Sequence, residues 1–112
     1  MASKKKVNIL GTDYNWIETT KHPILENTDG ACGTYDKTIV IEVDLFPNSV
    51  PINGNIEGER QEKSRCIKRH EIIHAYFNES GVRAYGNDER LVDWLTVMLP
   101  KIFETFKEMD CI

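Results

Sequence analysis

The chain has 112 residues and a net charge of −4, with 40% hydrophobic and 29% charged residues. This length suffices to bury a core without disulfides, so we expect one domain over residues 1–112. The acidic balance gives no electrostatic reason to expect nucleic acid as a partner. No apolar run approaches the ~20 residues that cross a bilayer, and no secretory signal is visible after the N-terminal lysines, so we expect no membrane association.

The cysteines indicate a reducing compartment. Cys32, Cys66 and Cys111 make an odd number, and none of them forms a CxxC pair. This pattern favours free thiols and disfavours a zinc ribbon or a thioredoxin-type site. We therefore expect a cytoplasmic protein.

Strand and turn signals fill the first half of the chain. A short strand is predicted over residues 7–10, ended by a turn at 11–13, and a weaker strand over 16–20. Residues 27–30 are predicted as a turn. The β-branched segment 38–44 is the strongest strand candidate, with Asp36 and Lys37 as the turn of a hairpin that feeds it. Residues 47–58, which contain two prolines, are predicted as a loop.

The second half is predicted to form two helices. The first runs from about residue 59 to 80, with Gly81 at the position that follows a helix end. The second spans about 88–108, with Asn87 or Asp88 as N-cap. Its apolar residues repeat at helical spacing, and Pro100 inside them predicts a kink or a break near residues 96–99. The sequence therefore predicts an α+β fold: a small antiparallel sheet packed on helices 59–80 and 88–108.

One motif carries chemistry. His70, Glu71 and His74 form an HExxH sequence inside the first helix. Residues four apart lie on the same face of a helix, so both imidazoles can reach one metal ion, and zinc suits such nitrogen ligands. Glu71, at the rim of this face, is predicted to accept a proton from the attacking water and to deliver it to a leaving amine. Cys66 lies about 12 Å from His74 along a helix axis, which is too far for a shared zinc.

The third metal ligand is expected on the second helix. A helical wheel places Glu89 at the flank of the apolar stripe and Asp93 almost opposite it. The wheel favours Glu89, with Asp93 and Asp88 as open alternatives. His22, in a loop-like stretch, is a weaker candidate that fits a surface residue better.

Tyrosines are candidates for stabilising a developing oxyanion. Tyr85 is the best placed by sequence, between the two ligand-bearing helices, while Tyr14 and Tyr76 are alternatives. Each of them also fits a plain packing role.

Several segments together resemble a family. Residues 69–75, 79–81, 87–95 and 100–102 resemble the small zincin-like metallopeptidases encoded by bacteriophages and prophages, as do residues 9–12 and 33–41. The resemblance covers most of the chain except residues 45–60. It implies a minimal zincin-like fold, a Zn²⁺ cofactor, and a protein or peptide substrate in the cytoplasm of a bacterial host.

A second, more distant resemblance concerns the order of motifs. HExxH followed by Glu-x-x-small-x-x-apolar-small is similar to the ImmA/IrrE-type metallopeptidases, which are gluzincin-like and use a glutamate as third zinc ligand. On this pattern Glu89 takes the ligand position and Val92 the small position, and Leu95 with Thr96 forms the apolar–small pair. Val92 and Thr96 stand where alanine is usual, yet both are small enough for close helix packing.

Two functions follow from these patterns. The first is a zinc metallopeptidase that uses a metal-activated water, with His70, His74 and Glu89 as ligands and Glu71 as general base. The second is a non-catalytic module in which zinc stabilises a zincin scaffold that binds a protein partner. An open metal position would favour the first function, and a closed four-ligand site the second.

Overall fold

The structure is a computed structural model that describes residues 3–45 and 56–112. Its elements, in chain order, are β1 (Ser3–Ile9), β2 (Thr12–Thr19), the 3-10 turn η1 (Pro23–Leu25), β3 (Gly30–Gly33), β4 (Thr38–Glu42), α1 (Ile56–Glu79), α2 (Arg83–Gly86) and α3 (Glu89–Glu108). Most of the loop predicted over residues 47–58 lies outside the described ranges.

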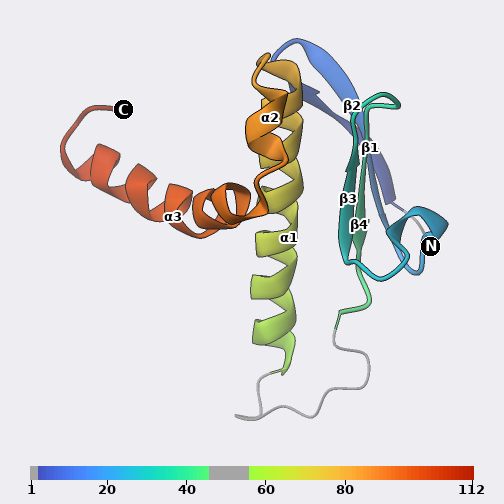
Figure 1. The fold of residues 1–112 in the computed structure, drawn as a ribbon. Coiled ribbons are helices and arrows are strands. Elements are labelled where there is room, and N and C mark those ends of the chain that lie inside the picture. Colours follow the sequence, from blue (N-terminus) through green and yellow to red (C-terminus); the bar gives the residue numbers. More distant parts are fainter. Residues whose placement is uncertain (1–2, 46–55) are drawn as a thin grey trace.

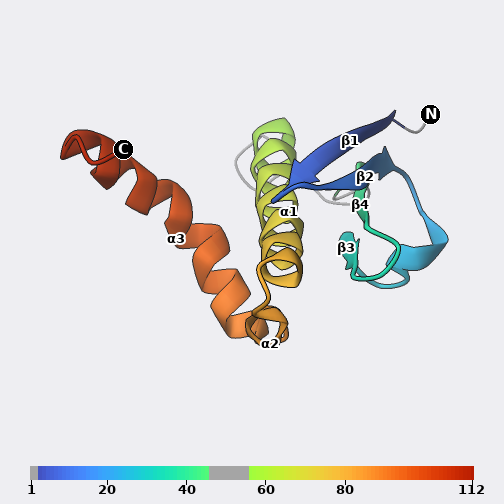
Figure 2. The same cartoon turned by 90° about the horizontal axis from the view of Figure 1, so that it is seen from above.

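The elements stack in successive layers. Helix α1 lies along one face of the sheet, and α3 lies on the side of α1 that faces away from the sheet (Figures 1 and 2). The α+β class is therefore confirmed. Helix α1 is the central layer, so its sequence has to serve two contact surfaces at once.

The sheet is mixed, which corrects the prediction of an antiparallel sheet. Its strand order is β1-β2-β4-β3, and β2 pairs with β4 in parallel, whereas the outer pairs are antiparallel. Strand β4 takes the central place because it is the most apolar strand: Ile39, Val40 and Ile41 are at most 1% exposed. Strand β3 is the edge strand beside it, and it begins at Gly30, the last residue of the turn predicted over residues 27–30.

Two tight turns set the register of the strands. Leu10 and Gly11 both have positive φ, 51° and 92°, as a two-residue hairpin turn between β1 and β2 requires. Asn8 supports this turn by accepting a hydrogen bond from the Gly11 N–H. The hairpin predicted around Asp36 and Lys37 is confirmed, because Gly33 pairs with Thr38 across that turn.

Helix α1 buries residues on two faces. Ile67 and Ala75 belong to the core formed with the sheet, whereas Ile73 lines the crevice that faces α3. Glu71 shares the sheet-facing stripe, since it lies four residues from both Ile67 and Ala75, and its residue is only 7% exposed. The helix ends at Glu79, and Gly81 follows with a φ of 83°, as predicted.

Pro100 does not split α3, so of the kink or break predicted near residues 96–99 the break is wrong. The helix continues from Glu89 to Glu108. A proline has no N–H for the carbonyl four residues earlier, here that of Thr96. The Arg69 side chain of α1 supplies the missing donor: its Nε lies 2.8 Å from the Thr96 carbonyl oxygen. A cross-helix hydrogen bond thus replaces the one that the proline removes.

Contact between α1 and α3 is made by small residues of α3. Val92 is fully buried and Thr96 is 1% exposed, whereas Trp94, Leu99 and Phe103 are each more than 40% exposed. The ImmA/IrrE-like pattern placed small residues at Val92 and Thr96, and these are the residues buried here.

No helix within the described ranges is long and apolar enough to cross a membrane.

Candidate metal centre

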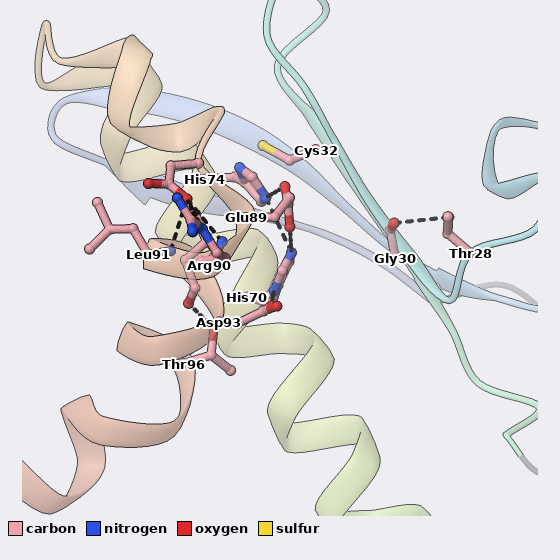
Figure 3. Close-up of polar contacts among 12 residues, drawn as sticks. Thr28, Gly30, Cys32, His70, His74, Glu89, Arg90, Leu91, Asp93 and Thr96 are labelled. Carbon is pink, nitrogen blue, oxygen red and sulfur yellow. Dashed lines mark hydrogen bonds and ion pairs between the residues drawn. The ribbon is translucent and has the colours of Figure 1, made fainter.

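Two histidines of α1 and one glutamate of α3 converge on a single point (Figure 3). The Nε2 atoms of His70 and His74 lie 3.2 Å apart. The Glu89 carboxylate lies 3.2 Å from His70 Nε2 through one oxygen and 3.0 Å from His74 Nε2 through the other. Within the described residues, these three side chains form a group that could hold a metal ion, with all donor atoms within 4.8 Å of one another.

The spacing of the donors fits a small tetrahedral ion. Ligand atoms at about 2.0–2.1 Å from a tetrahedral zinc lie about 3.3–3.4 Å from each other. The donors here are 3.0–3.2 Å apart, close to that separation. Burial lowers the pKa of His74, which favours the neutral ring that binds a metal. Two imidazoles and one carboxylate leave one tetrahedral position open.

The helix ends bring Glu89 to the histidines. The Asp88 side chain caps α3 by accepting hydrogen bonds from the Arg90 and Leu91 N–H groups, so Glu89 is the first residue of the helix. Asp88 is therefore the N-cap, for which the sequence offered Asn87 or Asp88. Its carboxylate binds the helix N–H groups and does not belong to the three-donor group. Gly86 allows α2 to approach α1 closely, because a Cβ there would lie 3.2 Å from the Phe77 Cβ and 3.7 Å from His74 Nδ1.

Asp93 lies behind His70 and outside the three-donor group. One of its carboxylate oxygens is 3.2 Å from His70 Nδ1, the ring nitrogen that faces away from His74 and Glu89. A proton on Nδ1 that is donated to Asp93 leaves the Nε2 lone pair free for a metal. The sequence reading considered Asp93 only as an alternative ligand and missed this orienting contact. Its position four residues after Glu89, on the same side of α3, is the signal that could have indicated it.

Glu71 lies between α1 and the start of β3. A Cβ on Gly30 would lie 2.8 Å from Glu71 Oε2 and 2.7 Å from Ile67 Cγ2, so only glycine fits at this position of β3. Burial, with a smaller contribution from the Glu89 charge, raises the pKa of Glu71 to about 7. A carboxylate with a pKa near neutrality is well matched to taking up and releasing a proton.

An open cleft of about 450 Å³ joins these groups. One wall is formed by α1 and the other by the segment that leads into β3. The lining contains Thr28, Asp29, Gly30, Lys63, Cys66, Ile67, His70, Glu71, His74 and Glu89. Cys66 thus lines the cleft without joining the three-donor group, in agreement with the distance argument from the sequence.

The other candidates lie elsewhere. Tyr85 is 57% exposed, its ring packs edge-on against Phe77, and it lines a different surface depression from the cleft. Tyr14 is fully buried and donates a hydrogen bond to Glu79, and Tyr76 lines the crevice between α1 and α3. His22 caps η1 by accepting a hydrogen bond from the Ile24 N–H. The structure does not bring any of these four side chains to the cleft.

Comparisons with known proteins give no match: no family model, curated protein or solved structure matches this chain.

Proposed function

We propose that this protein is a zinc-dependent peptidase whose metal is held by His70, His74 and Glu89. The observation that carries the proposal is the convergence of these three donors in an open cleft that Glu71 also lines. Two imidazoles and a carboxylate are a known ligand set of catalytic zinc sites, which keep a further position for water. Bound zinc would supply Lewis acidity, which polarises a carbonyl and lowers the pKa of water.

The remaining chemistry belongs to side chains of the protein. Glu71 is the general base: its carboxylate takes a proton from the attacking water and then donates it to the departing amine nitrogen. Asp93 is a positioning residue, because it fixes the orientation and the tautomer of the His70 ring. Gly30 is a second positioning residue, since its missing side chain leaves the space that the Glu71 carboxylate occupies.

Peptide is the proposed substrate class because a sheet edge borders the cleft. Strand β3 is the edge strand on that side, and among the described residues no strand pairs with its outer edge. The Asp29 carbonyl bonds to the Glu42 N–H, so in the antiparallel ladder the backbone groups of Cys32 point outward. An extended peptide could pair with this edge and pass the metal group.

The resemblance to phage-encoded zincin-like metallopeptidases supports the same proposal and adds a setting, the cytoplasm of a bacterial host. The gluzincin-like arrangement of Glu89, Val92 and Thr96 agrees with the buried α1–α3 contact.

A non-catalytic, zinc-stabilised binding module is the second candidate. One observation favours it: within the described residues the cleft lining contains no tyrosine to stabilise an oxyanion. In that case a closed site with four protein ligands is expected, rather than three ligands and a water.

An unbiased cleavage screen tests the proposed function. The zinc-loaded parent protein and Glu71→Gln are incubated with bacterial and phage proteins, and new peptide termini are identified by mass spectrometry. We expect the parent to cut and Glu71→Gln to retain zinc while losing about 10²–10⁴-fold in rate. Glu62→Gln, which changes an exposed glutamate of α1 outside the cleft lining, is the matched control and should cut like the parent. Equal cleavage by parent and Glu71→Gln would exclude this mechanism.

A further inference from the structure

The second half of α3 extends beyond its contact with α1, so the apolar face of this half is uncovered. Figures 1 and 2 show this half extending away from the rest of the molecule. At 100° per residue, Leu99 and Phe103 continue the line of Val92 and Thr96, which pack against α1. Val92 and Thr96 are at most 1% exposed, whereas Leu99 and Phe103 are 42% and 46% exposed. One helix face therefore changes from buried to uncovered along its length.

Concave apolar surface adjoins this exposed face. A crevice of about 410 Å³ runs between α1 and α3 and is lined by side chains such as Ile72, Tyr76 and Leu95. Leu99 borders this crevice and also a second depression that contains Phe103 and Phe106. We call the continuous surface of Tyr76, Leu95, Leu99, Ile102, Phe103 and Phe106 the α3 patch. It combines a protruding ridge with a groove next to it.

We propose that the α3 patch binds a second copy of this chain. In a two-fold dimer the same patch serves both partners, so a surface with both a ridge and a groove can complement itself. The second half of α3 in each copy would lie against the α1–α3 crevice of the other.

The area of the patch approaches the lower limit of what such a dimer needs. A large apolar or aromatic side chain buries about 150–250 Å², and the patch residues are partly exposed, so the patch offers on the order of 400–600 Å² per copy. The smallest stable specific interfaces bury about 600 Å² per partner. The apolar patch with a modest polar rim therefore reaches the lower limit of a stable interface.

The charges around the patch favour a like partner over a charged one. Lys101, Glu104, Lys107 and Glu108 balance one another in the second half of α3, and Lys107 is paired with Glu104 at 3.1 Å. A helix that binds an anionic membrane surface carries a rim rich in lysine and arginine, and a partner of strong charge requires a rim of opposite sign. Neither rim is present among the described residues of α3.

The proposal does not depend on the metal centre. None of the residues that line the cleft belongs to the α3 patch, so the dimer would leave the cleft open. Metal-free protein should therefore dimerise as the zinc-loaded protein does.

Sedimentation velocity of the full chain, from low to high micromolar concentration, tests the proposal. We expect the parent to pass from monomer to dimer as concentration rises. Phe103→Glu should weaken the dimer at least tenfold, because it places a charge in the interface. Val97→Glu is the matched control: Val97 is 51% exposed and lies on the opposite side of α3, so this variant should dimerise like the parent.

A second measurement covers the case in which Phe103→Glu fails to fold. Hydrogen exchange of the parent is compared at low and high concentration, and amides of residues 99–106 should exchange more slowly in the concentrated sample. A parent that stays monomeric at all concentrations would overturn the proposal. Equal weakening by Val97→Glu would overturn it too, as would a monomer that binds anionic vesicles through the α3 patch.

Discussion

Two glutamates of helix α1, Glu71 and Glu79, lie about two turns apart and have opposite surroundings. Glu79 accepts hydrogen bonds from the Thr12 and Tyr14 hydroxyls and from the Lys37 ammonium group. The bonds from Lys37 and Tyr14 lower its pKa to about 2. Glu71 is buried, receives no hydrogen bond from the described residues, and has its pKa raised to about 7. The ionised form of Glu79 is therefore stabilised, and the ionised form of Glu71 is destabilised.

Glu79 supports the fold, whereas the surroundings of Glu71 suit the proton transfer that the proposed function assigns to it. Glu79 connects the end of α1 to the sheet through β2 and the β3–β4 turn, so its charge contributes to the fold. A buried carboxylate without donors costs stability, and proteins retain such groups mainly at functional sites. Glu71 lines the same cleft as the three-donor group, and the proposed function gives a reason to retain its carboxylate there.

Replacing Glu71 should have the largest effect on stability, and it should stabilise the protein, whereas most substitutions destabilise. Glu71→Gln is expected to stabilise the metal-free protein by about 2–3 kcal/mol, because it removes a buried, unpaired charge. Urea unfolding at neutral pH with a chelator present measures this. Glu79→Gln should be destabilising under the same conditions. A Glu71→Gln protein that is less stable than the parent would place Glu71 among the structural carboxylates.

A methyl group at Gly30 should disturb Glu71 from the other side. The new Cβ would lie 2.7 Å from Ile67 Cγ2 and 2.8 Å from Glu71 Oε2. Gly30→Ala is therefore expected to cost about 2 kcal/mol by overpacking. Thermal or urea unfolding measures the loss, and the second change Ile67→Ala should recover part of the strain non-additively. Parent-like stability of Gly30→Ala would show that the carboxylate does not need this space.

The contact behind His70 should matter less than the ligands themselves. Asp93→Asn is expected to weaken zinc binding about tenfold, or about 1.4 kcal/mol, because an amide orients the imidazole less strongly. Titration calorimetry with zinc measures the affinity. Asp88→Asn is the control, because asparagine also caps a helix and Asp88 does not contact the histidines. Equal zinc affinities of the parent, Asp93→Asn and Asp88→Asn would show that Asp93 does not support zinc binding.

The smallest effect concerns acid stability and Glu79. Its folded pKa of about 2 lies below the ordinary value of 4.5, so as pH falls the unfolded chain takes up the proton first. The contribution of Glu79 is fully present above pH 4.5 and is lost as pH falls to about 2. Urea unfolding of metal-free protein across this window should show a steeper loss in the parent than in Glu79→Gln. Identical slopes would contradict the role given to the Thr12, Tyr14 and Lys37 contacts.

Sequence patterns predicted those parts of the molecule that depend on local spacing. The four-residue interval between His70 and His74 fixes their common face on α1. The wheel of α3 favoured Glu89 over Asp93, and Glu89 is the residue that lies beside both histidines. Gly81 marked the helix end for a similar reason, because its φ of 83° suits glycine.

Features that depend on tertiary packing were not predictable in this way. The parallel pairing of β2 with β4 results from the central place of β4 in the sheet. The continuity of α3 through Pro100 depends on Arg69, which reaches Thr96 from another helix. Glu71 was expected at the rim of the face that carries the two histidines, and its burial was not foreseen, because a wheel of α1 alone cannot show that the sheet covers that side of the helix.

Zinc X-ray absorption of the loaded protein tests most directly whether His70, His74 and Glu89 form one open metal site. We predict one zinc per chain, bound by two imidazole nitrogens and a carboxylate oxygen at about 2.0–2.2 Å, with a water as further ligand. Glu89→Ala should replace the carboxylate signal with a further water and weaken binding. A sulfur ligand, four protein ligands, or a spectrum unchanged by Glu89→Ala and His74→Ala would contradict the claim.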